Sequence, residues 1–256
     1  MGSLLPSKNS IWLIAGGVVA GAVFLWWETR SSSPMLDLRM FRHNRGFTFS
    51  NLAALVNYSG TWAVAFLLSL YLQYARGLDA ETAGLILISS PAVQAIFSPL
   101  AGRLSDRVEP RVLASAGMAI TGVGIGMLAF ITATTSTIYI IICLVLLGFG
   151  FALFSSPNTN AVMSSADQRY YGIASATLAT MRQMGMMVSM GIVWIVFGLV
   201  IGRVEITPEY YPALVKSVRL VFLICAVLCF GAIFFSMARG NIHKSGATES
   251  VADHGH

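Results

Sequence analysis

The stretch that decides the fold is residues 112–166, VLASAGMAITGVGIGMLAFITATTSTIYIIICLVLLGFGFALFSSPNTNAVMSSA, which carries no charged side chain at 55 consecutive positions. About 20 predominantly apolar residues in a helix cross a bilayer core of about 30 Å, so this stretch is too long for one span. Four threonines and a serine at 132–137 divide it, and Ser-Ser-Pro-Asn at 155–158 predicts the end of its second half. The stretch therefore predicts two adjacent transmembrane helices.

The composition of all 256 residues excludes a soluble fold. Hydrophobic residues make up 56% and charged residues 11%, whereas about 25% of an ordinary soluble domain is charged. Surface-to-volume scaling leaves a domain of this size too few interior positions to hide that much apolar surface. The net charge of +5 does not indicate nucleic-acid binding, because the basic residues occur singly between apolar blocks. We predict a multi-pass integral protein of the cell membrane, surrounded by the lipid bilayer.

The fold class predicted from these patterns is an all-α membrane protein. Backbone groups in lipid must be satisfied internally, and no stretch shows the alternation of a barrel strand, so the spans are expected to be helices. Residues 1–22 could instead be a signal peptide, but their one basic residue is Lys8 and the apolar run continues through Trp27. Seven spans are predicted, at residues 11–27, 47–74, 82–102, two within 112–166, 172–202 and 220–238.

Basic residues outside the spans predict the orientation. Ten Lys and Arg lie in one set of segments (28–45, 103–111, 157–171 and the tail), and five lie on the opposite side. Because cytoplasmic loops carry the excess of Lys and Arg, the C-terminus is predicted to be cytoplasmic and the N-terminus outside. The predicted organisation is a first helix with a cytoplasmic linker, a six-helix bundle, and a polar cytoplasmic tail, at residues 1–45, 46–238 and 239–256.

No Asp, Glu or His lies inside a predicted span. Proton relays in membrane pumps, nucleophile pairs and catalytic metal sites all need such side chains. The sequence therefore predicts no enzyme activity, no metal and no cofactor. Cys143, Cys225 and Cys229 lie in apolar runs and are predicted to be small buried hydrophobic residues.

One charged residue, Arg182, lies about ten residues into the sixth span. Placing an arginine near the middle of a bilayer costs about 2.5–3.5 kcal/mol, so its side chain is expected to face a cavity or polar partners. A structural hydrogen bond between helices is the alternative. Gln183 follows it, although adjacent helical residues point about 100° apart and need not share a face.

Three further polar residues are predicted inside spans: Asn57 and Tyr58 in the second, and Gln94 in the third. Pro91 and Pro99 flank Gln94 and are expected to kink that helix, freeing carbonyl groups toward a cavity. Asn and Gln also commonly bond between helices, so each residue alone is as consistent with packing as with a ligand site.

Three stretches of the sequence form a recognisable set of motifs: residues 102–111 (GRLSDRVEPR), residues 34–42 (PMLDLRMFR), and residues 156–159, 171–175 and 181–185 (SPNT, YGIAS and MRQMG). The first resembles the G-x-L-x-D-R-x-G-x-R loop of the major facilitator superfamily. The second resembles the segment after the eighth helix in the fourteen-helix drug:proton antiporter branch of that superfamily, and the third is similar to that branch's last cytoplasmic loop and penultimate helix. The resemblance covers about residues 11–238 and corresponds to the C-terminal half of those transporters, from the eighth to the fourteenth helix.

The resemblance implies a cytoplasmic gating loop. In the family, the Asp and Arg of this loop bind neighbouring helix ends and hold one conformation of the transport cycle. These roles fall here on Asp106, Arg107 and Arg111, and Gly102 would allow close approach of the helices. Glu109 departs from the pattern, which has glycine, and would strain the turn if a positive φ were needed there.

The function implied by the resemblance is transport of small amphipathic molecules by alternating access. Such transporters bind substrate between two helical bundles, so this chain would supply one wall of a cavity and would need a separate N-terminal half or a second copy of itself as partner. It would be a fragment or the product of a split gene. The expected wall residues are Asn57, Tyr58, Gln94, Arg182 and Gln183.

Two alternatives belong to other classes. The first is a non-transporting fragment or regulatory membrane subunit. The second is a seven-helix receptor or retinal photoreceptor, which is disfavoured because Lys216 precedes the predicted last helix and no span holds an acidic counter-ion.

Overall fold

The computed structural model describes residues 19, 23, 44–105, 107–202 and 208–238. The chain divides into two compact units, residues 1–43 and 44–256. The predicted first span, apart from Val19 and Val23, lies outside the described residues, as do the linker before residue 44 and the tail after residue 238. Everything below concerns the second unit.

Six segments of the described chain are long and apolar enough to cross a membrane, and they confirm the second to seventh predicted spans. The described residues contain helices and turns but no strand, which confirms the all-α membrane fold. The six segments are Arg45–Ala75, Ala80–Ser105, Pro110–Leu128, Thr137–Ser164, Gln168–Val200 and Pro208–Ala238.

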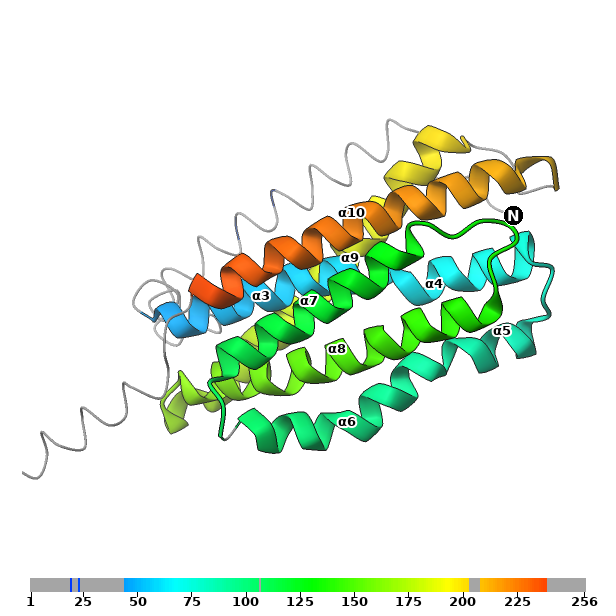
Figure 1. Ribbon diagram of the computed structural model, residues 1–256. Helices are drawn as coiled ribbons and strands as arrows, with labels where there is room; N and C mark the ends of the chain where they lie inside the picture. Colours follow the sequence, from blue (N-terminus) through cyan, green and yellow to red (C-terminus); the bar gives the residue numbers. More distant parts are fainter. Residues whose placement is uncertain (1–18, 20–22, 24–43, 106, 203–207, 239–256) are drawn as a thin grey trace, which may run out of the picture. The chain divides into compact units, whose positions relative to one another are not determined.

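Two of these six segments are interrupted, whereas the other four each contain one long helix (Figure 1). The first segment comprises α3 (Arg45–Thr61), α4 (Ala63–Leu70) and a π-helical turn, η1 (Tyr71–Ala75). The second comprises α5 (Ala80–Leu87) and α6 (Ser89–Ser105). The remaining helices are α7 (Pro110–Leu128), α8 (Thr137–Ser164), α9 (Tyr171–Val200) and α10 (Tyr211–Ala238).

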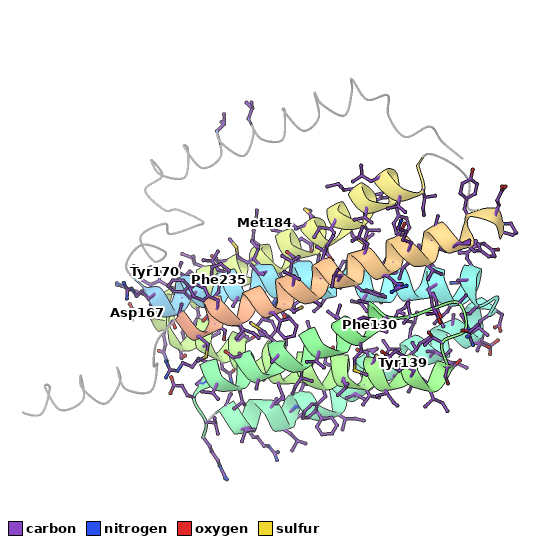
Figure 2. The ribbon with its side chains drawn as sticks, turned by 45° about the horizontal axis from the view of Figure 1, so that its top comes forward. Phe130, Tyr139, Asp167, Tyr170, Met184 and Phe235 are labelled. Atoms are coloured by element: carbon purple, nitrogen blue, oxygen red, sulfur yellow. The ribbon has the colours of Figure 1, made fainter. Side chains whose placement is uncertain are left out.

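Successive membrane-spanning segments run in opposite directions, so the loops between them gather at two ends (Figure 1). Figure 2 shows Phe130 and Tyr139, which flank the α7–α8 loop, at one end of the bundle, and Asp167 and Tyr170, between α8 and α9, at the other. The hydroxyl of Tyr139 donates a hydrogen bond of 2.8 Å to the Met127 carbonyl and so ties the start of α8 to the end of α7.

Polar side chains at helix starts match the capping rules. Asn44 Oδ1 accepts a hydrogen bond of 2.9 Å from the Phe47 N–H at the start of α3, and Asp79 Oδ2 accepts one of 3.0 Å from the Thr82 N–H at the start of α5. The N–H and hydroxyl of Thr82 hold the pKa of the Asp79 carboxyl below its usual value. Glu109 precedes Pro110 with φ −50°, so the strain anticipated there is absent.

The predicted end of a helix at residues 155–158 is wrong, because α8 continues through Pro157 to Ser164. Pro157 has no N–H to donate to the Leu153 carbonyl four residues earlier. Membrane helices tolerate such a break, because neighbouring groups and small local adjustments meet the freed carbonyl. In the next turn, Thr159 Oγ1 donates a hydrogen bond of 2.8 Å to the Ser155 carbonyl.

The predicted start of the last helix at residue 220 is also wrong, because α10 begins at Tyr211. Two cations that suggested a loop lie within the first turns of this helix. Lys216 is exposed in the second turn, and Arg219 Nε donates a hydrogen bond of 2.9 Å to the Ala129 carbonyl. Long basic side chains at a helix end reach polar surroundings, so they do not end the helix.

Small residues bring the helices of the bundle close together. One close contact joins α7 and α8, where a methyl group added at Gly150 would lie 2.7 Å from the Gly117 carbonyl oxygen. Another close contact joins α9 and α3, where a Cβ at Gly185 would lie 2.5 Å from the Leu55 carbonyl oxygen. The three cysteines are fully buried, as expected.

Candidate functional site

The first structural signal of a site is a local interruption in two membrane helices. Between α3 and α4, the Ala63 N–H donates a hydrogen bond of 3.0 Å to Ser189 Oγ of α9. Between α5 and α6, Ile88 keeps helical torsion angles (φ −63°, ψ −18°), but the ring nitrogen of Pro91 offers no donor to the Leu87 carbonyl. Each interruption is therefore a local break in the helical hydrogen bonds, and the backbone groups that it frees must meet other protein groups or face a cavity.

A cavity of about 880 Å³ lies at these two interruptions. Pockets that bind small molecules have volumes of about 300–1,000 Å³ and are mostly apolar with a few polar groups. This cavity matches that description, with lining residues from five of the six segments. Its aromatic, methionine and polar lining residues are Tyr58, Trp62, Phe66, Phe151, Met186, Met190, Thr61, Ser90, Gln94 and Thr121.

Two of the five expected wall residues, Tyr58 and Gln94, line this cavity. Tyr58 comes from α3 and Gln94 from α6, so segments far apart in the sequence supply its polar groups. The Tyr58 ring packs edge-on against Phe151 of α8, with ring centroids 5.3 Å apart. Phe151 was not predicted, because a phenylalanine in a membrane helix gives the same sequence signal whether it faces lipid or a ligand.

Arg182 lies next to the cavity and contacts one of its lining residues. Its Nη2 donates a hydrogen bond of 2.6 Å to Thr159 Oγ1, and its guanidinium carbon is 5.7 Å from the Tyr58 ring centroid. Met186 and Met190, four and eight residues further along α9, line the cavity from the same helix face. Arg182 therefore contacts a residue of the cavity wall, Tyr58, and also forms a hydrogen bond between helices, to Thr159.

The remaining two expected wall residues lie elsewhere. Asn57 is fully buried inside the bundle, and neither its Nδ2 nor its Oδ1 has a hydrogen-bond partner among the described residues. Gln183 is exposed on α9 and does not line the cavity. Neighbours in the sequence thus separate in space, because adjacent helical positions differ by about 100°.

The expected gating loop joins α6 and α7, and its Asp106 lies outside the described residues. A methyl group at Gly102 would lie 3.1 Å from Ser156 Oγ, so glycine lets α6 approach α8 closely. Arg107 is exposed, whereas Arg111 is partly buried. The gating roles of these residues remain predictions.

Hydrogen bonds also join α6 and α8 at this loop. Asn160 Nδ2 donates a hydrogen bond of 2.7 Å to Ser105 Oγ, whose hydroxyl donates one of 2.7 Å to the Gly102 carbonyl. In the part of the chain that the structure describes, no cluster of His, Cys, Asp and Glu could hold a metal ion.

Comparison with known proteins gives the family. The family model of the Major Facilitator Superfamily matches residues 50–252. The riboflavin transporter RibZ of Clostridioides difficile is 27% identical over 171 residues, which cover 66% of this chain and 37% of RibZ. The multidrug resistance protein Stp of Mycobacterium tuberculosis is 30% identical over 179 residues, covering 70% of this chain and 33% of Stp.

A third relative is the multidrug efflux pump LfrA of Mycolicibacterium smegmatis, which is 28% identical over 174 residues, covering 68% of this chain and 34% of LfrA. The chain spans about a third of the length of these curated relatives. The family match covers well over half of the chain and coincides with the helical bundle, which confirms the resemblance read from the motifs. The chain belongs to the Major Facilitator Superfamily, a family of multi-pass membrane transporters.

Proposed function

We propose that this chain forms the C-terminal bundle of a drug-efflux-like transporter that moves small amphipathic molecules by alternating access. The observation that carries the proposal is the 880 Å³ cavity at the two helix interruptions. In many transporters, interrupted helices form the substrate site near the middle of the membrane. The names of the relatives, which include multidrug and riboflavin transporters, agree with an organic small molecule as substrate.

The lining of the cavity suits a substrate with a large apolar part. Trp62, Phe66 and Phe151 offer flat aromatic surfaces, and Met186 and Met190 offer flexible, polarisable side chains. Methionine-rich surfaces repack around ligands of different shape, which favours broad rather than narrow selectivity. The amide of Gln94 adds a hydrogen-bonding group to this apolar wall.

The exposure of the helices that flank the cavity supports the presence of a partner bundle. Only 11% of the most apolar window of Ala80–Ser105 and 22% of that of Gln168–Val200 is buried inside the bundle, against 39–56% for the other four segments. On α9, the exposed side chains include Met184 (Figure 2), Met187 and Trp194. A second helical bundle covering α5, α6 and α9 would close the cavity, supplied by an N-terminal half or by a second copy of this chain.

The orientation is part of the proposal. The α6–α7 and α8–α9 loops, with Arg103, Arg107, Arg111 and Arg169, lie at the end that the charge asymmetry assigns to the cytoplasm. We expect a reporter enzyme that is active only outside the cytoplasm to stay inactive when fused after Ala238. Strong activity of this fusion, with a cytoplasmic reporter inactive at the same position, would reverse the topology.

The proposed function is tested by filling the cavity. Gly84 lines it, and a Cβ at this position meets no atom within 4 Å, so Gly84→Phe adds an aromatic side chain at the cavity wall. The probe is naphthalene-2-sulfonamide, an uncharged amphipathic molecule, and its binding to purified protein in lipid nanodiscs is followed by quenching of Trp62 fluorescence. We expect Gly84→Phe to weaken binding by about ten-fold or more, because an aromatic side chain takes the apolar contact area of the probe.

The matched control is Gly198→Phe on α9, where a Cβ also meets no atom within 4 Å but which does not line the cavity. This variant should bind as the unchanged protein does, and Trp62→Phe supplies the background signal. Equal binding by the Gly84 and Gly198 variants would remove the cavity from the proposal.

The same protein in proteoliposomes distinguishes a transporter bundle from a non-transporting subunit. In the described spans, the acidic residues are Glu81 and Glu209, each at the second residue of its span, where neither can carry a proton through the membrane. Binding without accumulation is expected from this chain alone. Gradient-driven accumulation by the chain alone would contradict the need for a second bundle, and accumulation that appears only with a partner bundle would exclude the non-transporting alternative.

A further inference from the structure

Arg182 places a positive charge far along α9, where its side chain is half-buried. It lies eleven residues after Tyr171, the first residue of α9, which corresponds to about 16 Å along the helix. Among the residues that the structure describes, no carboxylate forms an ion pair with Arg182, and the acidic residues lie in loops or at the ends of spans.

The neutral contacts of Arg182 hold its side chain without neutralising it. Arg182 Nη2 donates a hydrogen bond to Thr159 Oγ1, and the Thr159 hydroxyl in turn donates one to the Ser155 carbonyl. The Tyr58 ring supplies a weak attraction through its π-electrons. Its Nε is buried and has no hydrogen-bond partner in the described part of the chain. The guanidinium is therefore fixed in place and retains N–H groups for a further acceptor.

Tyr58 joins this cation to the cavity. It contributes to the cavity wall and also lies against the guanidinium. On α9, Arg182 occupies the helix face that continues through Met186 and Met190 into the cavity lining. A molecule with its apolar part among Trp62, Phe151 and the methionines can thus bring an attached charged group toward Arg182.

We propose that the substrates of this cavity are amphipathic anions, whose carboxylate, sulfonate or phosphate group binds Arg182. The inference rests on the proposed transport function and names its substrate class. A planar guanidinium donates parallel hydrogen bonds to such groups, and these charge-assisted bonds are stronger where the bundle excludes water. Thr159 and Tyr58 are positioning residues that hold the guanidinium for the anion.

The experiment compares two probes of nearly identical shape in the unchanged protein. Naphthalene-2-sulfonate carries one negative charge, and naphthalene-2-sulfonamide carries none at pH 7. Binding is measured in nanodiscs of uncharged lipid by quenching of Trp62 fluorescence. We expect the sulfonate to bind about ten-fold or more tightly than the sulfonamide, since hydrogen bonds to a charged group are the stronger kind. Equal affinities would overturn the inference, and this comparison needs no variant to fold.

A variant then assigns the preference to one residue. Arg182→Gln should abolish the preference for the sulfonate and leave sulfonamide binding nearly unchanged. Lys216→Gln removes the same charge from an exposed position near the start of α10 and should retain the full preference. A preference that survives in Arg182→Gln protein with unchanged sulfonamide binding would assign the anion to another group and overturn the role of Arg182.

The two proposals fail in different ways. If the cavity does not bind amphipathic molecules, neither probe will show binding that is sensitive to Gly84→Phe. If the cavity binds them without regard to charge, the sulfonamide will respond to Gly84→Phe while the two probes bind equally, and only the anion inference is lost.

Discussion

Gly150→Ala will lower the melting temperature of the purified protein in detergent by about 5 °C or more. A Cβ at Gly150 would lie 2.5 Å from Thr121 Oγ1, 2.7 Å from the Gly117 carbonyl oxygen and 2.7 Å from the Thr121 nitrogen. Two of these atoms belong to the backbone of α7, so the added methyl group must push the two helices apart. Overpacking costs about 1–3 kcal/mol, and about 1 kcal/mol shifts the melting temperature of a chain this long by about 2–4 °C.

The matched control is Gly231→Ala on α10, where a Cβ meets no atom within 4 Å. Alanine favours a helix over glycine by up to about 1 kcal/mol, so this variant should melt at the same temperature as the unchanged protein or slightly above it. Similar melting temperatures for the two alanine variants would show that α7 and α8 do not depend on this contact.

Asn57→Leu is expected to raise the melting temperature by several degrees. Both polar atoms of the Asn57 side chain are buried without a hydrogen-bond partner among the described residues, and the residue is 0% exposed. An unsatisfied buried polar group costs about 1–3 kcal/mol, whereas leucine has the same branching at Cγ and no polar atom. The measurement is thermal unfolding in detergent, followed by tryptophan fluorescence.

Ser189→Ala provides the opposite case. Ser189 is as deeply buried as Asn57, but its hydroxyl oxygen accepts the Ala63 N–H at the interruption between α3 and α4. Its removal leaves that donor without an acceptor, so this variant should melt earlier. A loss of stability in Asn57→Leu as large as that in Ser189→Ala would mean that the amide has a bonding partner, such as a buried water molecule.

Most of the membrane architecture follows from the sequence because lipid leaves the chain few alternatives. A charge-free run of about 20 residues in a bilayer must satisfy its own backbone, and a helix does so within one segment. The errors occurred at Pro157 and Lys216, where rules taken from soluble helices were applied. A membrane helix tolerates a proline because neighbouring groups meet the freed carbonyl, and a long lysine side chain reaches polar surroundings from within a helix.

The site was less predictable, because it depends on the helix face that each residue occupies. Asn57 and Tyr58 are adjacent, yet the first is enclosed by the bundle and the second lines the cavity. Both side chains are polar, so the sequence indicated both equally as candidate site residues. Trp62, Phe151, Met186 and the other apolar lining residues carry no distinguishing signal in a sequence where 56% of residues are hydrophobic. Their role depends on the packing of the helices, which brings these residues together around one cavity.

The bond from the Ala63 N–H to Ser189 Oγ places a hinge point in the first segment. Beyond this point α4 is eight residues long, which corresponds to about 12 Å, and its residues Val64, Ala65 and Phe66 line the cavity. A tilt of about 10° at Trp62 would move the far end of α4 by about 2 Å, as its length requires. Such a tilt would strain two hydrogen bonds, the one from Ala63 to Ser189 Oγ and the helical one from the Trp62 N–H to the Tyr58 carbonyl. The width of the cavity beside α4 therefore depends on these two bonds.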